Sequence, residues 1–141
     1  MKRKASALWR GGLKDGHGAI STESGVLKDT QYSFSARFEN GIGTNPEELI
    51  AAAHAGCFSM ALSAQLGNAN LKPEQIATTA TVTMEKLDAG WTLTAVHLDV
   101  VARIANATPA AFETAANNAK SGCPISRVLN AKITMDAKLE Q

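Results

Sequence analysis

TNPEELIAAAHAGCFSMAL, residues 44–62, has the pattern of a helix with a strong start signal followed by apolar and small residues. Asn45 is a favoured N-cap residue, Pro46 stands at the first helical position, and Glu48 can complete a capping box. No formally charged residue occurs between Glu48 and Lys72, so no face of the helix is charged as a solvent-exposed face usually is. A helix that is apolar all round is usually buried, and this stretch therefore predicts a buried central helix.

The size and composition of the chain predict one globular domain over residues 1–141. A chain of this length can build a hydrophobic core without disulfides or metal. Hydrophobic residues make up 45% of the chain and charged residues 19%, which is ordinary for a folded protein. The net charge is +1, with both signs spread along the chain, and only 5% of residues are aromatic. These values argue against a nucleic-acid partner, which needs clustered basic residues or stacking aromatic side chains.

The N-terminus is basic but lacks the apolar segment of a secretory signal. Two cysteines in such a chain are typical of a reducing compartment, so we expect a cytoplasmic protein without a lasting structural disulfide. The uncharged run over 49–71 is long enough to be considered as a membrane span. It contains His54, Gln65, two asparagines and few large aliphatic residues, which favours a buried helix and no membrane partner.

Hydrophobic alternation and turn residues predict six strands around the central helix, which we expect to end at Leu66 with Gly67 as its cap. The strands are predicted over 3–10, 19–24, 31–39, 76–86, 91–104 and 131–139, with a hairpin at Asp88-Ala89-Gly90 and a bulge near Ala95. A second helix is predicted from Thr108-Pro109 to Ser121, and a short one over 125–129. This order is that of an α+β fold with helices covering a mainly antiparallel sheet.

The two cysteines stand in different local settings. Cys57 lies about three turns into the central helix, too far from its start for the helix dipole to lower its pKa. A lone cysteine in an alanine-rich helix is more often a packing residue. Cys123, between Gly122 and Pro124, falls at the N-cap of the short helix, where free backbone N–H groups stabilise a thiolate. Together they could be a peroxide-reactive thiol and its resolving partner, or they could be unrelated.

Two charged residues are candidates for the same site. Arg37 lies on the polar face of the strand predicted over 31–39, where it either faces solvent or supplies the cation that a buried thiolate lacks. Glu47 precedes Cys57 by ten residues, which is roughly 15 Å along a helix. Glu47 is therefore either an acid favoured at a helix start, or it reaches the site of Cys57 through a long side chain or from a second subunit.

A zinc site is a further alternative. His54 and Cys57 share one face of the central helix, and with Cys123 they could supply three ligands. No Cys-x-x-Cys spacing is present, and His54 can equally form a hydrogen bond inside the core. His17 and His97 carry no signal beyond that of surface residues.

Taken together, these motifs resemble the OsmC family of thiol peroxidases, the osmotically inducible and organic-hydroperoxide-resistance group. The resemblance runs in one order over nearly the whole chain, and either cysteine motif alone would be weaker. His54 before the cysteine, and Arg37 on the third predicted strand, are similar to the OsmC branch rather than the Ohr branch. The matching stretches are Thr22-Glu23-Ser24-Gly25, Ala36-Arg37-Phe38, Gly43–Leu49, Ala53–Leu62 and Gly122-Cys123-Pro124-Ile125-Ser126.

The resemblance implies a peroxidase without a metal, prosthetic group or other cofactor. Cys57 would be the peroxidatic thiol and Cys123 the resolving thiol, with Arg37 and Glu47 forming a charge network beside the reactive sulfur. It also implies an intertwined homodimer with active sites at the subunit interface, and a lipoyl-type dithiol as reductant. The expected substrate is an organic hydroperoxide, which Cys57 would reduce to an alcohol. The main alternative is a non-catalytic redox sensor whose disulfide controls the binding of a partner.

Overall fold

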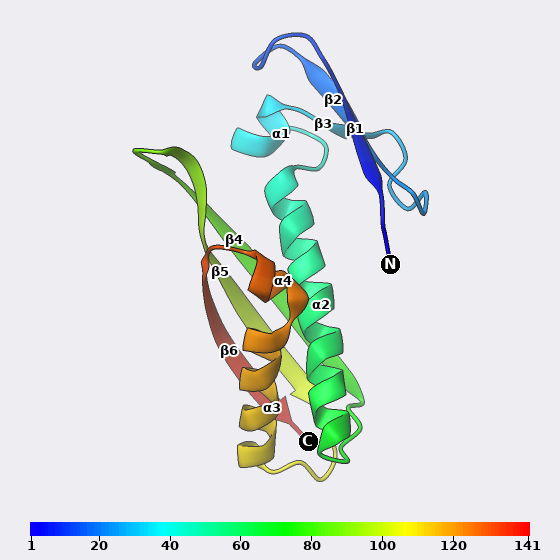
Figure 1. Cartoon of the computed structure of the whole chain (residues 1–141), viewed down its shortest axis with the longest axis vertical. Helices are drawn as coiled ribbons and strands as arrows, with labels where there is room; N and C mark the ends of the chain where they lie inside the picture. Colours follow the sequence, from blue (N-terminus) through cyan, green and yellow to red (C-terminus); the bar gives the residue numbers. More distant parts are fainter. The chain divides into compact units, whose positions relative to one another are not determined.

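The computed structural model describes all 141 residues, Met1–Gln141 (Figure 1). The chain divides into two compact units, Met1–Leu49 and Ile50–Gln141. Each unit contains a three-stranded sheet, with the order β1-β2-β3 in the first and β4-β5-β6 in the second. With its helices, the chain has the α+β class that the sequence predicts.

The first unit begins with β1 (Ala5–Arg10), β2 (His17–Thr22) and β3 (Thr30–Tyr32), which pair antiparallel. The first two strands confirm the predictions over 3–10 and 19–24 to within two residues at each end. The rings of Trp9 and Tyr32 pack across this sheet with their centroids 5.4 Å apart. Gly18 lies under them, and a Cβ there would stand 2.4 Å from the Tyr32 ring, so the packing requires glycine.

The predicted strand over 31–39 is wrong beyond Tyr32, because the chain turns into helix α1 (Phe34–Phe38). Ser33 is the N-cap of this helix, and its hydroxyl accepts a hydrogen bond from the Ala36 backbone N–H at 3.1 Å. Phe34 and Phe38 alternate with polar residues, but they also stand four apart, so a single helical turn brings their rings to 4.8 Å. Arg37 therefore projects from a helix and not from the polar face of a strand.

Helix α2 (Pro46–Asn68) is the long helix predicted from its start signal. The Asn45 side chain accepts a hydrogen bond from the Glu48 N–H at 2.8 Å, which confirms the cap. The Glu48 carboxylate accepts from the Thr44 hydroxyl at 2.8 Å, in place of the Asn45 N–H that a capping box would use.

The helix ends two residues later than expected, at Asn68. The left-handed residue that closes it is Asn70, with φ 60, and not Gly67. The Leu71 N–H then bonds to the Leu66 carbonyl at 2.9 Å, as in a Schellman-type end.

The second sheet pairs β4 (Gln75–Leu87) antiparallel with β5 (Gly90–Arg103), and β5 parallel with β6 (Lys132–Glu140). The hairpin at residues 88–90 is confirmed. The register shifts between Thr83 and Met84, opposite Ala95 and Leu93, so the predicted bulge is confirmed next to Ala95. One pairing of the four in the chain is parallel, and the sheets are otherwise antiparallel, as predicted.

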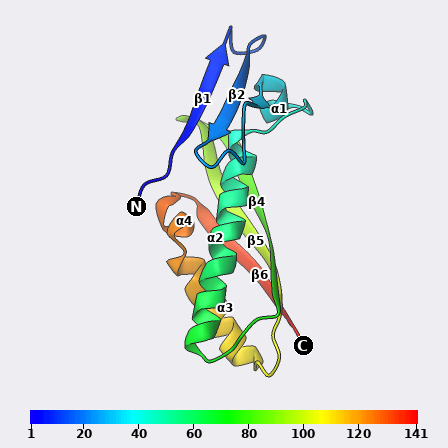
Figure 2. The same cartoon turned by 90° about the vertical axis from the view of Figure 1, so that its right-hand side faces the viewer.

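Helix α3 (Pro109–Gly122) begins at the predicted cap Thr108, and helix α4 (Pro124–Val128) follows at once. Helices α2 and α3 lie along one face of the β4-β5-β6 sheet (Figures 1 and 2). The apolar core of the second unit is built from this face and from these two helices. Its largest members are Phe58, Leu62 and Leu66 of α2, Leu98 of β5, Ile104 and Phe112.

Burial of α2 differs from the sequence prediction. Its buried residues, His54, Phe58, Leu62 and Leu66, stand four apart and form a single stripe. Other apolar residues of α2 face outward in the single chain, and Met60 is 77% exposed. By length and composition α2 is also the one helix that could cross a membrane, and 22% of its most apolar segment is buried within the chain. In this chain the buried stripe packs on the sheet, as a core helix does.

Candidate active site

The two cysteines meet in the second unit of the chain. Cys57 lies in the middle of α2, and Cys123 stands where α3 ends and α4 begins. Both are free thiols, and their sulfur atoms lie 2.9 Å apart, within hydrogen-bond distance. Cys123 is fully buried, whereas Cys57 is partly accessible. The structure therefore brings together the two residues that the sequence offered as a pair, and leaves the outer one open to a reactant.

The surroundings of Cys57 act on its ionisation in opposite directions. Burial raises the pKa of the Cys57 thiol above its usual value, and the nearby Cys123 sulfur raises it further. A hydrogen bond with the Ile125 backbone N–H acts the other way and lowers this pKa. The site in this single chain therefore holds one amide that favours the thiolate, against the cost of burial.

The role of the Ile125 amide was not predicted, although the sequence carries a signal for it. Pro124 opens α4, so the N–H of the next residue belongs to the first turn and has no partner within the helix. We expected these amides to serve Cys123, but the Cys123 side chain makes no capping hydrogen bond. The Ile125 amide serves Cys57 instead, because α4 places its first turn against the sulfur of a different helix.

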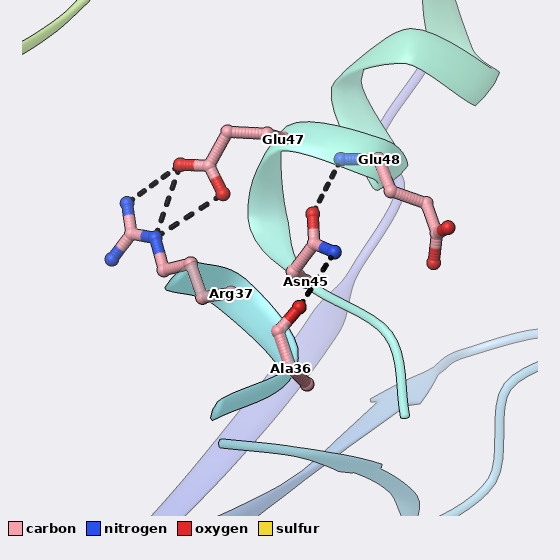
Figure 3. A network of polar contacts seen from close by, with 5 residues as sticks. All are labelled: Ala36, Arg37, Asn45, Glu47 and Glu48. Atoms are coloured by element: carbon pink, nitrogen blue, oxygen red, sulfur yellow. Dashed lines mark hydrogen bonds and ion pairs between the residues drawn. The ribbon is translucent and has the colours of Figure 1, made fainter. Parts of the chain in front are cut away.

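Arg37 and Glu47 form an ion pair in the first unit of the chain (Figure 3). Arg37 Nε lies 3.1 and 3.2 Å from the two carboxylate oxygens of Glu47, and Arg37 Nη2 lies 2.8 Å from Oε1. This is the fork geometry that guanidinium and carboxylate groups prefer. Asn45 also donates to the Ala36 carbonyl at 3.1 Å, which fixes α1 against the start of α2. The predicted partnership of Arg37 and Glu47 is thus present, and Nη1 of Arg37 is left for another acceptor.

An apolar cleft of about 270 Å³ lies beside Arg37 in the first unit. The cleft is not predictable from the local pattern, because the aromatic residues of 31–39 also fit one face of a strand. The cleft is lined by Trp9, Leu13, Tyr32, Ser33, Phe34, Arg37, Phe38 and Pro46. Arg37 is the charged residue of this lining, and its guanidinium carbon lies 5.2 Å from the centroid of the Phe38 ring.

His54 is fully buried on α2 and forms a hydrogen bond with Ser126 of α4. Its Nε2 lies 2.7 Å from Ser126 Oγ, whereas its Nδ1 has no partner. Burial lowers the pKa of this imidazole, so it is held in the neutral form. His54 Nε2 is engaged by Ser126, and the group of converging metal-binding side chains in the chain includes neither His54 nor the cysteines, so the zinc alternative receives no support from this arrangement.

Metal-binding atoms do converge at His97, Asp99 and Asp136, within 4.8 Å of one another. His97 Nε2 lies 3.3 Å from Asp99 and 3.2 Å from Asp136, and its Nδ1 lies 2.6 Å from Thr134 Oγ1. From the sequence His97 carries no signal beyond that of a surface residue, because the parallel pairing of β5 with β6 that brings Asp136 beside it has no local signature. Both carboxylates are exposed, so the group is accounted for as a cluster of polar side chains at the surface.

The four predicted site residues are thus found as two pairs. Arg37 joins Glu47 in the unit Met1–Leu49, and Cys57 joins Cys123 in the unit Ile50–Gln141. A fold of this kind, with a partly accessible thiol on a long apolar helix and a buried thiol against it, defines a class of α+β proteins with a redox-capable cysteine pair.

A family model described as OsmC-like protein matches residues 38–138. The chain is also 49% identical over 140 residues to two proteins named Peroxiredoxin OsmC, from Escherichia coli (strain K12) and Shigella flexneri. Each match covers 99% of this chain and 98% of the relative. The chain therefore belongs to the OsmC family, and the resemblance inferred from its motifs is confirmed.

Solved structures agree with this assignment. The organic hydroperoxide resistance protein OhrB of Bacillus subtilis is 26% identical, with a TM-score of 0.69 over 96% of this chain and 98% of its own. An OsmC-like protein of unknown function from Vibrio cholerae is 14% identical, with a TM-score of 0.78 over 97% and 99% of the two chains. The second likeness concerns the fold alone, and both support the OsmC-like α+β architecture.

Proposed function

We propose that this protein is a cysteine-based peroxidase of the peroxiredoxin type that reduces organic hydroperoxides to alcohols. The observation that carries the proposal is the pair of free thiols, Cys57 and Cys123, with sulfur atoms 2.9 Å apart. The proposal is supported by the names of two full-length relatives, which are peroxiredoxins, and of OhrB, which is an organic hydroperoxide resistance protein.

In the first step the Cys57 thiolate attacks the distal oxygen of the hydroperoxide. The O–O bond breaks, the alkoxide takes up a proton and leaves as the alcohol, and Cys57 becomes a sulfenic acid. The Ile125 amide favours the thiolate, and the free donors of Arg37 can stabilise both the thiolate and the charge that develops on the leaving oxygen. Glu47 holds the guanidinium in a fixed direction through three hydrogen bonds.

In the second step the Cys123 thiol attacks the sulfur of the Cys57 sulfenic acid. The S–S bond forms, the S–O bond breaks, and hydroxide leaves as water with the proton of Cys123. The two sulfurs start 2.9 Å apart. They must approach by roughly 1 Å to reach the length of a disulfide bond. An external dithiol, for which the family resemblance points to the lipoyl type, then reduces the disulfide.

The apolar cleft beside Arg37 suits the organic part of such a substrate. Its wall is mainly aromatic and aliphatic, and its volume of about 270 Å³ lies just below the range of about 300–1,000 Å³ that is typical of small-molecule pockets. A hydroperoxide placed with its alkyl or aryl group there would present its polar end to the one charged group of the lining. Hydrogen peroxide lacks an apolar part and would gain nothing from this wall.

We further propose that the working protein is a homodimer, in which residues 1–141 form one OsmC-like domain per subunit and the active sites lie at the interface. Met60 and the small residues around it leave an uncharged face of α2 uncovered in the single chain. Solvent-facing sides of helices normally carry charge, so a second copy is the natural cover for this face. Glu47 and Cys57 are ten residues apart on α2, so a partner subunit is also one way to bring Arg37–Glu47 to the cysteines.

Turnover tests the peroxidase proposal directly and separates it from a redox sensor. Reduced protein is mixed with excess cumene hydroperoxide and dihydrolipoamide, and peroxide loss is followed. We expect many equivalents of peroxide to be consumed per subunit by the wild type, and none above background by Cys57→Ser. The Thr114→Ala variant, at an exposed position of α3, is the control and should behave as wild type. A single equivalent consumed, with no further loss, would instead indicate a sensor of the cytoplasmic redox state.

A further inference from the structure

A hydrogen bond between His54 and Ser126 joins the same two segments that carry the cysteines. His54 precedes Cys57 by three residues on α2, and Ser126 follows Cys123 by three residues on α4. Residues three apart lie on one face of a helix. The His54–Ser126 bond of 2.7 Å and the Cys57–Cys123 pair at 2.9 Å are therefore two neighbouring links between α2 and the start of α4.

Little else holds α4 in place. The helix has five residues, Pro124–Val128, none of which is buried. A helix this short is not stable by itself. Of its side chains, Ser126 makes the one hydrogen bond that reaches another element. The position of α4 thus depends on this bond, on the hydrogen bond of the Ile125 backbone N–H with Cys57, on its covalent link to α3 and on the buried Cys123 that precedes it.

The His54 imidazole is an unfavourable choice for packing alone. Its side chain is fully buried, and Nδ1 has no hydrogen-bond partner. A buried polar atom without a partner destabilises the fold, and an apolar side chain of similar size would avoid this cost. Since burial keeps the ring neutral, Nε2 can serve Ser126 as a donor or an acceptor. The loss of stability caused by the unpartnered Nδ1 is explained if the hydrogen bond between Nε2 and Ser126 has a function.

We infer that the His54–Ser126 hydrogen bond positions α4 so that Cys123 reaches oxidised Cys57, and so controls the resolving step. The inference rests on the proposed peroxidase function. His54 and Ser126 are positioning residues, because they act through the placement of α4 and not on the peroxide. Disulfide formation requires the Cys123 sulfur to approach the Cys57 sulfur in line with the departing oxygen, and misplacement by about 1 Å slows such a step greatly. Attack on the peroxide does not need Cys123, and Cys57 lies on the long helix α2 rather than on α4.

A single-turnover experiment separates the two steps. Reduced protein is mixed with one equivalent of cumene hydroperoxide, and samples are quenched at millisecond intervals. Cys57 sulfenic acid is trapped with dimedone, and the Cys57–Cys123 disulfide is counted by intact mass. For Ser126→Ala we expect disulfide formation to slow by about 10- to 100-fold, with peroxide loss within about twofold of wild type. The dimedone adduct should accumulate in this variant and not in the wild type.

Matched variants distinguish positioning from general loosening. Ser126→Thr keeps the hydroxyl and should restore the rate, whereas His54→Leu should slow disulfide formation as Ser126→Ala does. Ser59→Ala removes a 2.8 Å bond between α2 and Thr78 of β4, and should leave the resolving step unchanged. A Ser126→Ala protein that forms its disulfide at the wild-type rate would overturn the inference, as would equal slowing in Ser59→Ala.

Oxidation by diamide gives a readout that requires no peroxide chemistry. Diamide converts a dithiol to a disulfide through attack of one thiol on the activated sulfur of the other, so it also needs Cys123 to reach Cys57. We expect the same order of rates, with wild type and Ser59→Ala fast and Ser126→Ala slow. If the wild type fails to consume hydroperoxide, the proposed function fails while this comparison still decides whether the bond positions α4. Equal diamide rates in all variants would overturn the positioning role.

Discussion

The Cys57 sulfur is subject to burial and to a second sulfur, both of which raise its pKa, and to one backbone amide that lowers it. A peroxidatic cysteine reacts as the thiolate, so the amide alone leaves this residue poorly activated. An additional cation is needed, and Arg37, held in direction by Glu47, is the residue we propose for it.

Replacement of Arg37 by alanine tests this assignment. Loss of a neighbouring cation should raise the pKa of the Cys57 thiol further. The pH dependence of iodoacetamide alkylation at Cys57, read by mass spectrometry in a Cys123→Ser background, gives this pKa. Arg10→Ala, which removes an exposed arginine from β1, is the control. Identical alkylation profiles for Arg37→Ala and wild type would remove Arg37 from the site.

His54 predicts a specific dependence of stability on pH. Burial lowers its pKa in the folded state below the value of about 6.5 for an exposed histidine. Below that pH the unfolded chain binds more protons than the folded one, so the free energy of unfolding falls as the pH drops from 6.5 toward the folded pKa. Above 6.5 the effect is absent. Urea unfolding at pH 7.5 and 5.5 should show a larger loss of stability for wild type than for His54→Gln, which cannot titrate, and equal losses would contradict the prediction.

At the scale of the element, helix α1 shows what determines whether a short segment forms a strand or a helix. The residues from 31 to 39 alternate between apolar and polar, and their aromatic residues also stand four apart. The alternation fits a strand and the four-residue spacing fits a helix, and a strand was predicted from the alternation. The cap at Ser33 and the packing of Phe34 on Phe38 favour the helix. The outcome matters for function, because the helix directs Arg37 toward Glu47.

The Ser33 cap should be measurable in the stability of the protein. Ser33→Ala removes the acceptor for the Ala36 N–H and is expected to cost about 1 kcal/mol of unfolding free energy. Ser33→Asp keeps a capping oxygen and should stay close to wild type. Urea denaturation followed by circular dichroism gives both values. If Ser33→Ala and Ser33→Asp unfold at the same urea concentration, the hydroxyl does not cap α1 in solution.

At the scale of the whole molecule, the uncovered face of α2 is the feature that one chain does not explain. The helix packs through one stripe of residues and leaves Met60 exposed, without any charge between Glu48 and Lys72. Burial of such a face against a second copy would remove apolar surface from water, which is the main driving force for association.

The dimer proposal predicts the effect of a charge on this face. Met60→Lys would bury an unpaired ammonium group in the interface and should dissociate the dimer. We expect a monomeric mass by light scattering at micromolar concentration, and loss of peroxide turnover if the active site needs both subunits. Met60→Leu keeps the apolar character and should remain dimeric and active. A monomeric wild type under the same conditions would refute the dimer.

The sequence by itself determined the elements with strong local signals. Capping residues set the starts of α2 and α3, alternation set β4, and glycine with a phase change set the hairpin and the bulge of β5, because each of these signals acts over a few neighbouring residues. The sequence also determined the family, because the motifs around Cys57 and Cys123 can be recognised from the order of residues without the structure.

Only the tertiary structure decided where the chemistry of those motifs is directed. It placed the Ile125 amide on Cys57 and not on Cys123, joined His54 to Ser126, and turned Arg37 toward Glu47 from a helix. The first two are contacts between residues about seventy positions apart, which depend on how α4 packs beside α2. Local patterns carry no information about such packing, because its free energy comes from surfaces that meet only when the chain has folded.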